Sequence, residues 1–333
     1  MISILNNPNI VYEYSKDSLE KFEFENGKIL ENVEVEYVVK GAPKYDKDGN
    51  IENMVIFCHN YDGSSFSIDG FSQLTSEGKP FDFNEYFFVS ITSLGVPGSC
   101  SPSSTNLRYN FPKYSFKDKV NFKRQFIKEK FGSNQVLGIV GRGLGGYEAY
   151  TWACEYSEDM EFIIVLSSSF KTNGYRYVVA RGIESVIEAS DNFYSDVYNE
   201  SLSKTMVSIN KILYSNYFSR RIFQGMSNDE IDVLMDEYVD DGLFIDIYDF
   251  KFQNDSILGY DVEDKLSDIK AKTLVISPTD DLYFSPEFDT LPLKELINDC
   301  ELYLFDLHID NLNNIDYAKF IETLSPFLEQ FKK

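Results

Sequence analysis

VLGIVGRGLGG, residues 136–146, places a glycine-rich turn directly behind a short apolar run. The run 136–140 has the composition of a buried strand, and the residues from about Leu144 have helical spacing. Two interpretations fit this strand, turn and helix. The glycines follow G-x-G-x-x-G, which is typical of dinucleotide-binding turns. The same residues follow G-x-S-x-G with Gly143 in place of the serine, which is the pattern of a nucleophile elbow.

The dinucleotide interpretation lacks its other requirements. Such a unit carries an Asp or Glu at the end of its second strand, about 20 residues after the turn. Here the next apolar run, 162–166, ends in the three serines 167–169. The chain also has 31 basic and 54 acidic side chains, a net charge of −23, which disfavours a pyrophosphate ligand. We therefore favour the nucleophile elbow.

An elbow of this kind has an acid and then a histidine further along the chain. Asp280 and Asp281 follow an apolar run at 273–277, and His308 follows another at 301–305. Both runs have the composition of buried strands. Because ligands bind outside the carboxyl ends of parallel strands, these side chains are expected at the same edge of a sheet as the glycine turn.

Strand-like and helix-like segments alternate along most of the chain. A hairpin is predicted over 22–40, around an Asn-Gly-Lys turn. Further strands are predicted at 54–58, 86–91, 136–140, 162–166, 273–277 and 301–305, and helices at 115–131, 144–156 and 315–331. This alternation predicts a mostly parallel α/β sheet with helices on both faces. Residues 170–262 contain only helix-like or irregular segments, so we predict a helical insertion into a core formed by 1–169 and 263–333.

The composition excludes several classes of function. The acidic balance argues against nucleic acid and anionic membranes as partners. We find no signal peptide, and no apolar run reaches the ~18 residues of a membrane span. The four cysteines (Cys58, Cys100, Cys154 and Cys300) are widely spaced and are typical of reduced thiols, so a cytoplasmic location is expected. With 2 His and no zinc-type spacing, neither a metal site nor a cofactor is predicted.

Six motifs, in order, resemble the homoserine O-acetyltransferase branch of the α/β-hydrolase superfamily, including its esterase-like relatives. They are FENGKILENVEVEYVVKG, FCHNYDGSS, LGVPGSCSPSS, IVGRGLGGYEAYTWACEY, SPTDDLYFSPE and DLHIDN. The resemblance covers nearly everything from Phe22 to the C-terminus. It implies an α/β-hydrolase fold with a helical lid and the chemistry of acyl transfer or ester hydrolysis.

The resemblance assigns a role to each site residue. The assigned positions are Gly143 for the nucleophile, His308 for the base, Asp281 (with Asp280 as the alternative) for the acid, and the backbone N–H groups of Tyr61 and Leu144 for the oxyanion hole. In an intact member the base takes the proton of the serine, the acid orients the base, and the oxyanion hole stabilises the developing charge. His59 is expected to support the loop that carries Tyr61.

Gly143 removes the attacking atom. Loss of the serine from such a triad costs on the order of 10⁶ in turnover, whereas glycine adopts the strained elbow conformation freely. The sequence therefore predicts a member that is inactive or strongly impaired, in other words a pseudoenzyme. Three alternatives stay open: a relocated nucleophile among Ser99, Cys100 and Ser101; His308 acting as a general base without a covalent intermediate; or a serine mutant of an active enzyme.

The substrate-binding positions also depart from the family. Acetyltransferases of this branch place an arginine on the first insertion helix to bind the substrate carboxylate, and Glu184 stands at that position. Arg181, one turn earlier, is the candidate replacement, and Cys100 is expected to border the pocket. Glu184 would repel a carboxylate, which places homoserine in doubt, and the net charge of −23 disfavours the anionic acetyl-CoA. The resemblance implies a small acyl compound or ester as ligand. The apolar residues of the insertion are compatible with a homodimer formed through the lid.

Overall fold

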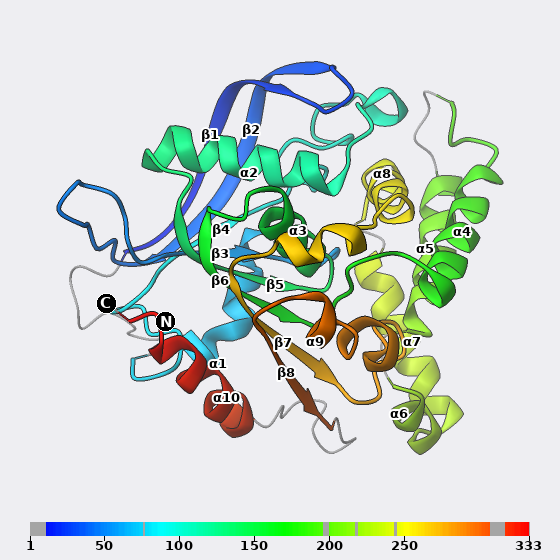
Figure 1. Cartoon of the computed structure of the whole chain (residues 1–333). Coiled ribbons are helices and arrows are strands. Elements are labelled where there is room, and N and C mark those ends of the chain that lie inside the picture. The colour runs from blue at the N-terminus through cyan, green and yellow to red at the C-terminus, as the bar shows by residue number, and fades with distance from the viewer. Residues whose placement is uncertain are drawn as a thin grey trace.

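The computed structural model describes residues 11–75, 77–195, 200–216, 219–242, 245–306 and 317–332. One eight-stranded sheet, in the order β1-β2-β4-β3-β5-β6-β7-β8, runs through the molecule (Figure 1). The strands are β1 (Val11–Glu23), β2 (Ile29–Gly41), β3 (Met54–Cys58), β4 (Phe87–Ile91), β5 (Val136–Arg142), β6 (Met160–Leu166), β7 (Lys272–Pro278) and β8 (Cys300–Phe305).

The pairing of the strands confirms the predicted, mostly parallel sheet. β1 and β2 form an antiparallel hairpin, and β2 also pairs antiparallel with β4. The pairs from β4 through β3, β5, β6 and β7 to β8 are all parallel. The hairpin turn lies between Glu23 and Ile29, as predicted, but β1 begins at Val11, well before residue 22. The described residues from Glu13 to Ser18 are exposed or only partly buried and mostly polar, so apolar alternation did not mark this part of the strand.

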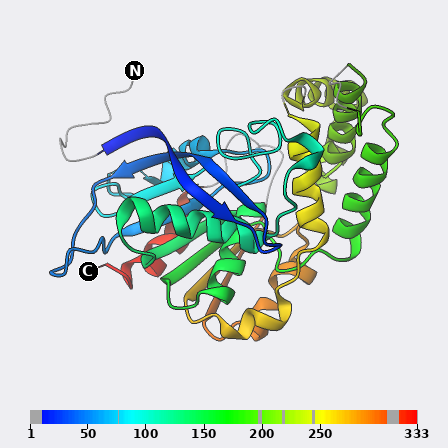
Figure 2. The ribbon, with the colours of Figure 1, turned by 90° about the horizontal axis from the view of Figure 1, so that it is seen from above.

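Helices cover both faces of the sheet (Figures 1 and 2). On one face lie α2 (Phe116–Phe131), α3 (Leu144–Glu155) and the short α9 (Leu293–Leu296), and on the other lie α1 (Ser72–Thr75) and α10 (Tyr317–Glu329). Successive side chains of a strand point to opposite faces, so within β3 Ile56 joins the first core and Val55 the second. α2 starts at a capping box formed by Ser115 and Asp118.

The segment between β6 and β7 is helical in its described parts. It contains α4 (Gly174–Glu188), α5 (Glu200–Tyr214), α6 (Arg220–Gly225), α7 (Asn228–Gly242) and α8 (Ile247–Leu258). These helices stand beside the sheet as a separate group (Figure 2), and α4, α5 and α8 share an apolar cluster of their own. The two ends of the segment meet at a bridge between Lys171 and Asp261, where Thr172 N–H donates to Tyr260 O at 2.8 Å.

Shorter helical turns complete the described chain: η1 (Ser65–Phe71), η2 (Arg108–Asn110), η3 (Glu263–Asp268) and the π-helical η4 (Pro286–Thr290).

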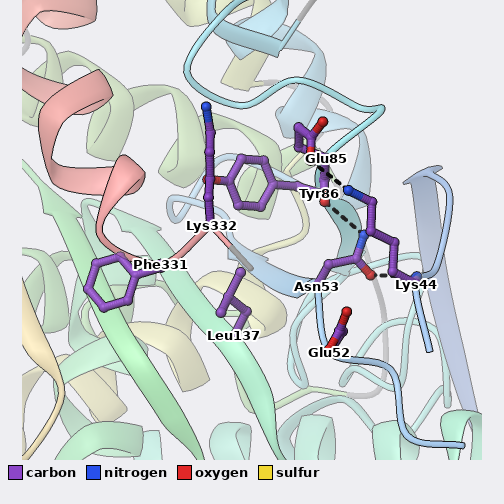
Figure 3. Close-up of a pocket in the computed structure, with 8 residues that line it drawn as sticks. All are labelled: Lys44, Glu52, Asn53, Glu85, Tyr86, Leu137, Phe331 and Lys332. Atoms are coloured by element: carbon purple, nitrogen blue, oxygen red, sulfur yellow. Dashed lines mark hydrogen bonds and ion pairs between the residues drawn. The ribbon is translucent and has the colours of Figure 1, made fainter. Parts of the chain in front are cut away.

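A small cavity lies at the amino ends of the parallel strands, between Asn53, Tyr86, Leu137 and Phe331 (Figure 3). The glycine turn after β5 is at the opposite, carboxyl edge. Within the described residues, no helix has the length and apolar character needed to cross a bilayer.

Candidate active site

A sharp turn at Gly143 joins β5 to α3. Gly143 has φ 55° and ψ −118° and is the residue just before the helix. Its N–H donates to Leu166 O at 3.0 Å, while its carbonyl oxygen accepts from Ser168 Oγ at 2.7 Å and from Gly146 N–H at 3.0 Å. Residues with side chains rarely adopt this positive φ. The backbone N–H of Leu144, at the positive end of the helix dipole, is positioned to bind a negative oxygen.

The other glycines of the motif allow α3 to approach the sheet. A Cβ atom on Gly145 would lie 2.0 Å from the carbonyl oxygen of Cys58, at the end of β3. A Cβ atom on Gly146 would lie 2.3 Å from the Oγ of Ser168. These glycines are therefore explained by close packing between helix and sheet, and no phosphate ligand is needed to account for them.

The loop after β3 is held by His59. His59 Nδ1 donates to the carbonyl oxygen of Asn60 at 2.7 Å, and Nε2 accepts from Ser93 N–H at 2.9 Å. The ring is 3% exposed, and burial together with the nearby Lys123 charge lowers the pKa of His59 to about 3. A neutral ring with both nitrogens bonded to backbone has a structural role, which agrees with its expected support of this loop.

Asn60 occupies the space in front of the glycine turn. Its Oδ1 accepts from the N–H of Leu144 at 3.1 Å. A Cβ atom on Gly143 would lie only 2.0 Å from the same Oδ1. The next residue, Tyr61, uses its carbonyl oxygen to accept from Gln253 Nε2 of α8 at 3.1 Å. Asn60 was not among the predicted site residues, because its role follows from a side-chain rotation that no sequence motif encodes.

The acid loop follows β7. Asp281 Oδ1 accepts from the N–H groups of Tyr283 at 2.9 Å and Phe284 at 2.8 Å, which fixes the carboxylate. Burial raises the pKa of Asp281 to about 6. Both carboxylate oxygens of Asp280 are buried and have no hydrogen-bond partner among the described residues. His308, the predicted base, lies outside the described residues, so its position relative to Gly143 and Asp281 stays a prediction.

A buried charge pair lies beneath this edge of the sheet. Lys123 Nζ of α2 is 2.5 Å from Glu148 of α3, and both side chains are at most 2% exposed. Ser93 Oγ donates to the other oxygen of Glu148 at 2.6 Å. Lys119 Nζ approaches Oε1 of Gln253 at 3.4 Å. Because Ser93 also contacts His59, the Lys123–Glu148 pair is linked to the loop after β3. Gln253, the partner of Lys119, contacts the same loop at Tyr61.

Comparisons with known proteins assign this arrangement to a family. No family model matches the chain. The chain is 36% identical over 310 residues to a protein of Methanothermobacter thermautotrophicus named "Probable acyltransferase", and the match spans 93% of this chain and 96% of the relative. An acetylester hydrolase of Corynebacterium glutamicum has the same fold, with a TM-score of 0.83 at 20% identity, over 95% of this chain and 96% of that one.

The chain belongs to the α/β-hydrolase superfamily. Its relatives include acyltransferases and esterases. A homoserine O-acetyltransferase of C. glutamicum is 27% identical over 183 residues, which is 53% of this α/β-hydrolase and 48% of that enzyme. The family relationship indicated by the six motifs is thereby confirmed, together with the α/β-hydrolase fold.

The predicted substrate-binding residues of this α/β-hydrolase lie apart from the elbow. Arg181 and Glu184 pair with each other on α4, and the side chain of Arg181 is 56% exposed. Both line an open groove of about 650 Å³ between α4, α8 and the loop before α2. Neither Gly143 nor Asp281 lines this groove. A ligand role for Arg181 and Glu184 therefore stays a prediction.

The proposed relocated nucleophiles lie in a loop that packs on β2. Cys100 is 2% exposed, its N–H donates to Glu34 O at 3.0 Å, and burial raises the pKa of its thiol to about 12. Ser99 Oγ accepts from Glu36 N–H at 2.9 Å, and Ser101 is fully buried. A neutral, buried thiol is a poor nucleophile, so the described contacts give this alternative no support.

Arg176 is a second buried residue that sequence inspection missed. Its guanidinium is 2.5 Å from Asp289 in η4, and it also donates to Ser169 Oγ at 2.9 Å and to the carbonyl oxygen of Tyr283 at 3.0 Å. These bonds tie the first insertion helix to the acid loop.

Among the residues that the structure describes, no three His, Cys, Asp or Glu side chains gather to hold a metal ion.

Proposed function

We propose that this chain binds a small acyl compound at the carboxyl edge of its sheet but forms no acyl-enzyme, because Gly143 holds the position of the nucleophile. The observation that carries the proposal is the backbone at Gly143, with φ 55° and ψ −118° between β5 and α3. A strained turn from strand to helix is the arrangement that presents a nucleophile in α/β-hydrolases. Here it presents only the hydrogen atoms of a glycine.

The remaining parts support binding rather than turnover. The N–H of Leu144 lies at the start of α3, where the helix dipole favours a partly negative oxygen. The Asn60 amide oxygen accepts from it at 3.1 Å, so an ester carbonyl that binds there has to displace this amide. The acid loop keeps its carboxylate in place through two backbone N–H groups. Without a serine, however, the oxyanion of a tetrahedral acyl-enzyme intermediate does not form, and the cost is on the order of 10⁶ in turnover.

The charges favour an uncharged acyl ligand. The chain carries a net charge of −23, which repels a polyanion such as acetyl-CoA. Arg181, the candidate carboxylate binder, is paired with Glu184. A short neutral ester is not repelled by the net charge and needs no free arginine, so esters are the first ligands to test.

A second candidate function is ester hydrolysis with His308 as a general base that activates water. The fixed carboxylate of Asp281 favours it, because this mechanism needs an acid that orients the histidine. In this mechanism no covalent intermediate forms, and the water would have to share the space in front of Gly143 with the Asn60 amide.

Hydrolysis of p-nitrophenyl acetate separates the two candidates. The proposal predicts background rates for the chain as it stands and for Gly143→Ala, and measurable hydrolysis for Gly143→Ser. The alanine variant is the matched control, because it adds the β-carbon without a hydroxyl. Binding is followed by the shift in melting temperature that the ester produces in the unchanged chain. Hydrolysis by the unchanged chain that His308→Ala abolishes would overturn the proposal and favour the second candidate.

A further inference from the structure

We propose that Asn60 fills the acceptor position of the oxyanion hole, and that Gly143 is the residue that makes room for it. This inference rests on the proposed function and names the group that occupies the space beside Gly143. Asn60 Oδ1 accepts from Leu144 N–H at 3.1 Å. That N–H is the donor that a substrate carbonyl oxygen requires in an active relative.

A side chain at position 143 and this orientation of Asn60 exclude each other. A Cβ atom on Gly143 would lie 2.0 Å from Oδ1 and 2.7 Å from Cγ of Asn60. Both distances are far below van der Waals contact, so one of the two groups must move. The glycine and the asparagine therefore form a complementary pair, in which the amide fills the space left by the missing serine side chain.

The surroundings of Asn60 keep its amide near the turn. Its carbonyl oxygen accepts from His59 Nδ1 at 2.7 Å and from Gly63 N–H at 3.1 Å, which fixes the backbone. The side chain can then leave only by rotation about its own torsions. The orientation of the amide follows from its partner: Leu144 N–H is a donor, so the oxygen faces it and the Nδ2 group faces away.

The bound amide competes with a substrate. A neutral ester carbonyl is an acceptor of similar kind to the Asn60 amide, and the amide is already in place without any loss of translational freedom. Only a charged oxyanion is a clearly stronger acceptor at a helix N-terminus. A serine placed at 143 therefore has to displace Asn60 before it acts, and the displaced amide stays beside the attacking atom.

A double-mutant cycle tests the pairing without any need for catalysis. The melting temperatures of the unchanged chain, Asn60→Ala, Gly143→Ala and the double variant are compared. Gly143→Ala is expected to lower the melting temperature more when Asn60 is present than when it is alanine. Asn60→Asp keeps an acceptor oxygen and should keep the coupling. Asn298→Ala, which removes an exposed asparagine bonded to Ser267 O, should show none. Additive effects of the Asn60 and Gly143 substitutions would overturn the inference.

Ester hydrolysis tests the consequence. With p-nitrophenyl acetate, Gly143→Ser combined with Asn60→Ala should exceed Gly143→Ser alone by about ten-fold or more in kcat/KM, because a free oxyanion donor is worth at least that much. Equal, measurable kcat/KM values would overturn the inference and leave the proposed function standing. If neither serine variant turns over, the proposed function is in doubt, and the melting cycle alone decides on Asn60.

Discussion

The hydroxyl of Ser168 donates to the carbonyl oxygen of Gly143 at 2.7 Å, so the turn after β5 is anchored by the residue two positions beyond the end of β6. Ser168 is fully buried, and its side chain also lies where a Cβ atom on Gly146 would be. The sharp turn that we propose as the nucleophile elbow is therefore held in place from β6.

Ser168→Ala should lower the free energy of unfolding by about 1 kcal/mol, the usual contribution of a buried hydrogen bond. Denaturation by urea measures this. The matched control is Ser208→Ala, whose hydroxyl donates to Lys204 O on the exposed face of α5. A loss no larger than that of the control would contradict the anchoring role of Ser168.

Glu148→Gln should be among the most destabilising single changes in the chain. The substitution leaves Lys123 charged and buried without its 2.5 Å partner, for which a loss of about 3 kcal/mol is expected. Glu200→Gln, in an exposed pair with Lys204, serves as the control and should have a much smaller effect. Similar unfolding curves for the two variants would show that the buried pair does not stabilise the core.

Substitutions of two arginines on α4 should lower the free energy of unfolding by very different amounts. Arg176→Met removes the buried partner of Asp289 and should lower the free energy of unfolding by about 3 kcal/mol. Arg181→Met removes only an exposed partner of Glu184 and should cost less than about 1 kcal/mol. Chemical denaturation of both variants provides the comparison, and equal losses would contradict the clamp between α4 and the acid loop.

Asp249 should make stability depend on pH. Burial raises its pKa from 3.8 to about 6, although the backbone N–H and hydroxyl of Ser103 donate to it. The folded chain therefore holds a proton that the unfolded chain releases between about pH 4 and 6. Stability from this group is complete below pH 4, falls by about 3 kcal/mol as the pH rises to 6, and is constant above it.

In the isosteric Asp249→Asn variant the free energy of unfolding should not fall over this range. The difference in free energy of unfolding between the variant and the unchanged chain should therefore increase from pH 4 to pH 6. Urea denaturation across that range measures the difference. Asp236→Asn, on the exposed side of α7, is the control and should follow the unchanged chain. A constant difference between Asp249→Asn and the unchanged chain over this range would contradict the assignment.

The sequence was sufficient to predict the strands and turns that carry the candidate site, whereas the roles of the residues on them stay predictions. The apolar run of β3 was placed from Met54 to Cys58, and the turn at Gly143 and the acid after β7 followed from the order of strands along the chain. These features come from local apolar patterning and turn residues, which short windows of sequence record. His308 was placed by the same reasoning but lies outside the described residues.

Contacts between residues far apart in the sequence could not be predicted from the sequence. The bond from Asn60 to Leu144 joins residues 84 positions apart, and the Arg176–Asp289 pair joins residues 113 positions apart. Both depend on side-chain torsions within the assembled fold. Lys123 and Glu148 have the composition of solvated helix residues, so only packing reveals that they face each other in the core.

Intact-protein mass spectrometry with p-nitrophenyl acetate tests the central claim most directly. The unchanged chain should keep its own mass during incubation and release nitrophenolate no faster than buffer, while Gly143→Ser with Asn60→Ala should gain an acetyl group at position 143. An acetyl adduct at the active site of the unchanged chain, or turnover by it that is lost in His308→Ala, would contradict the claim that Gly143 leaves the site without acyl-transfer chemistry.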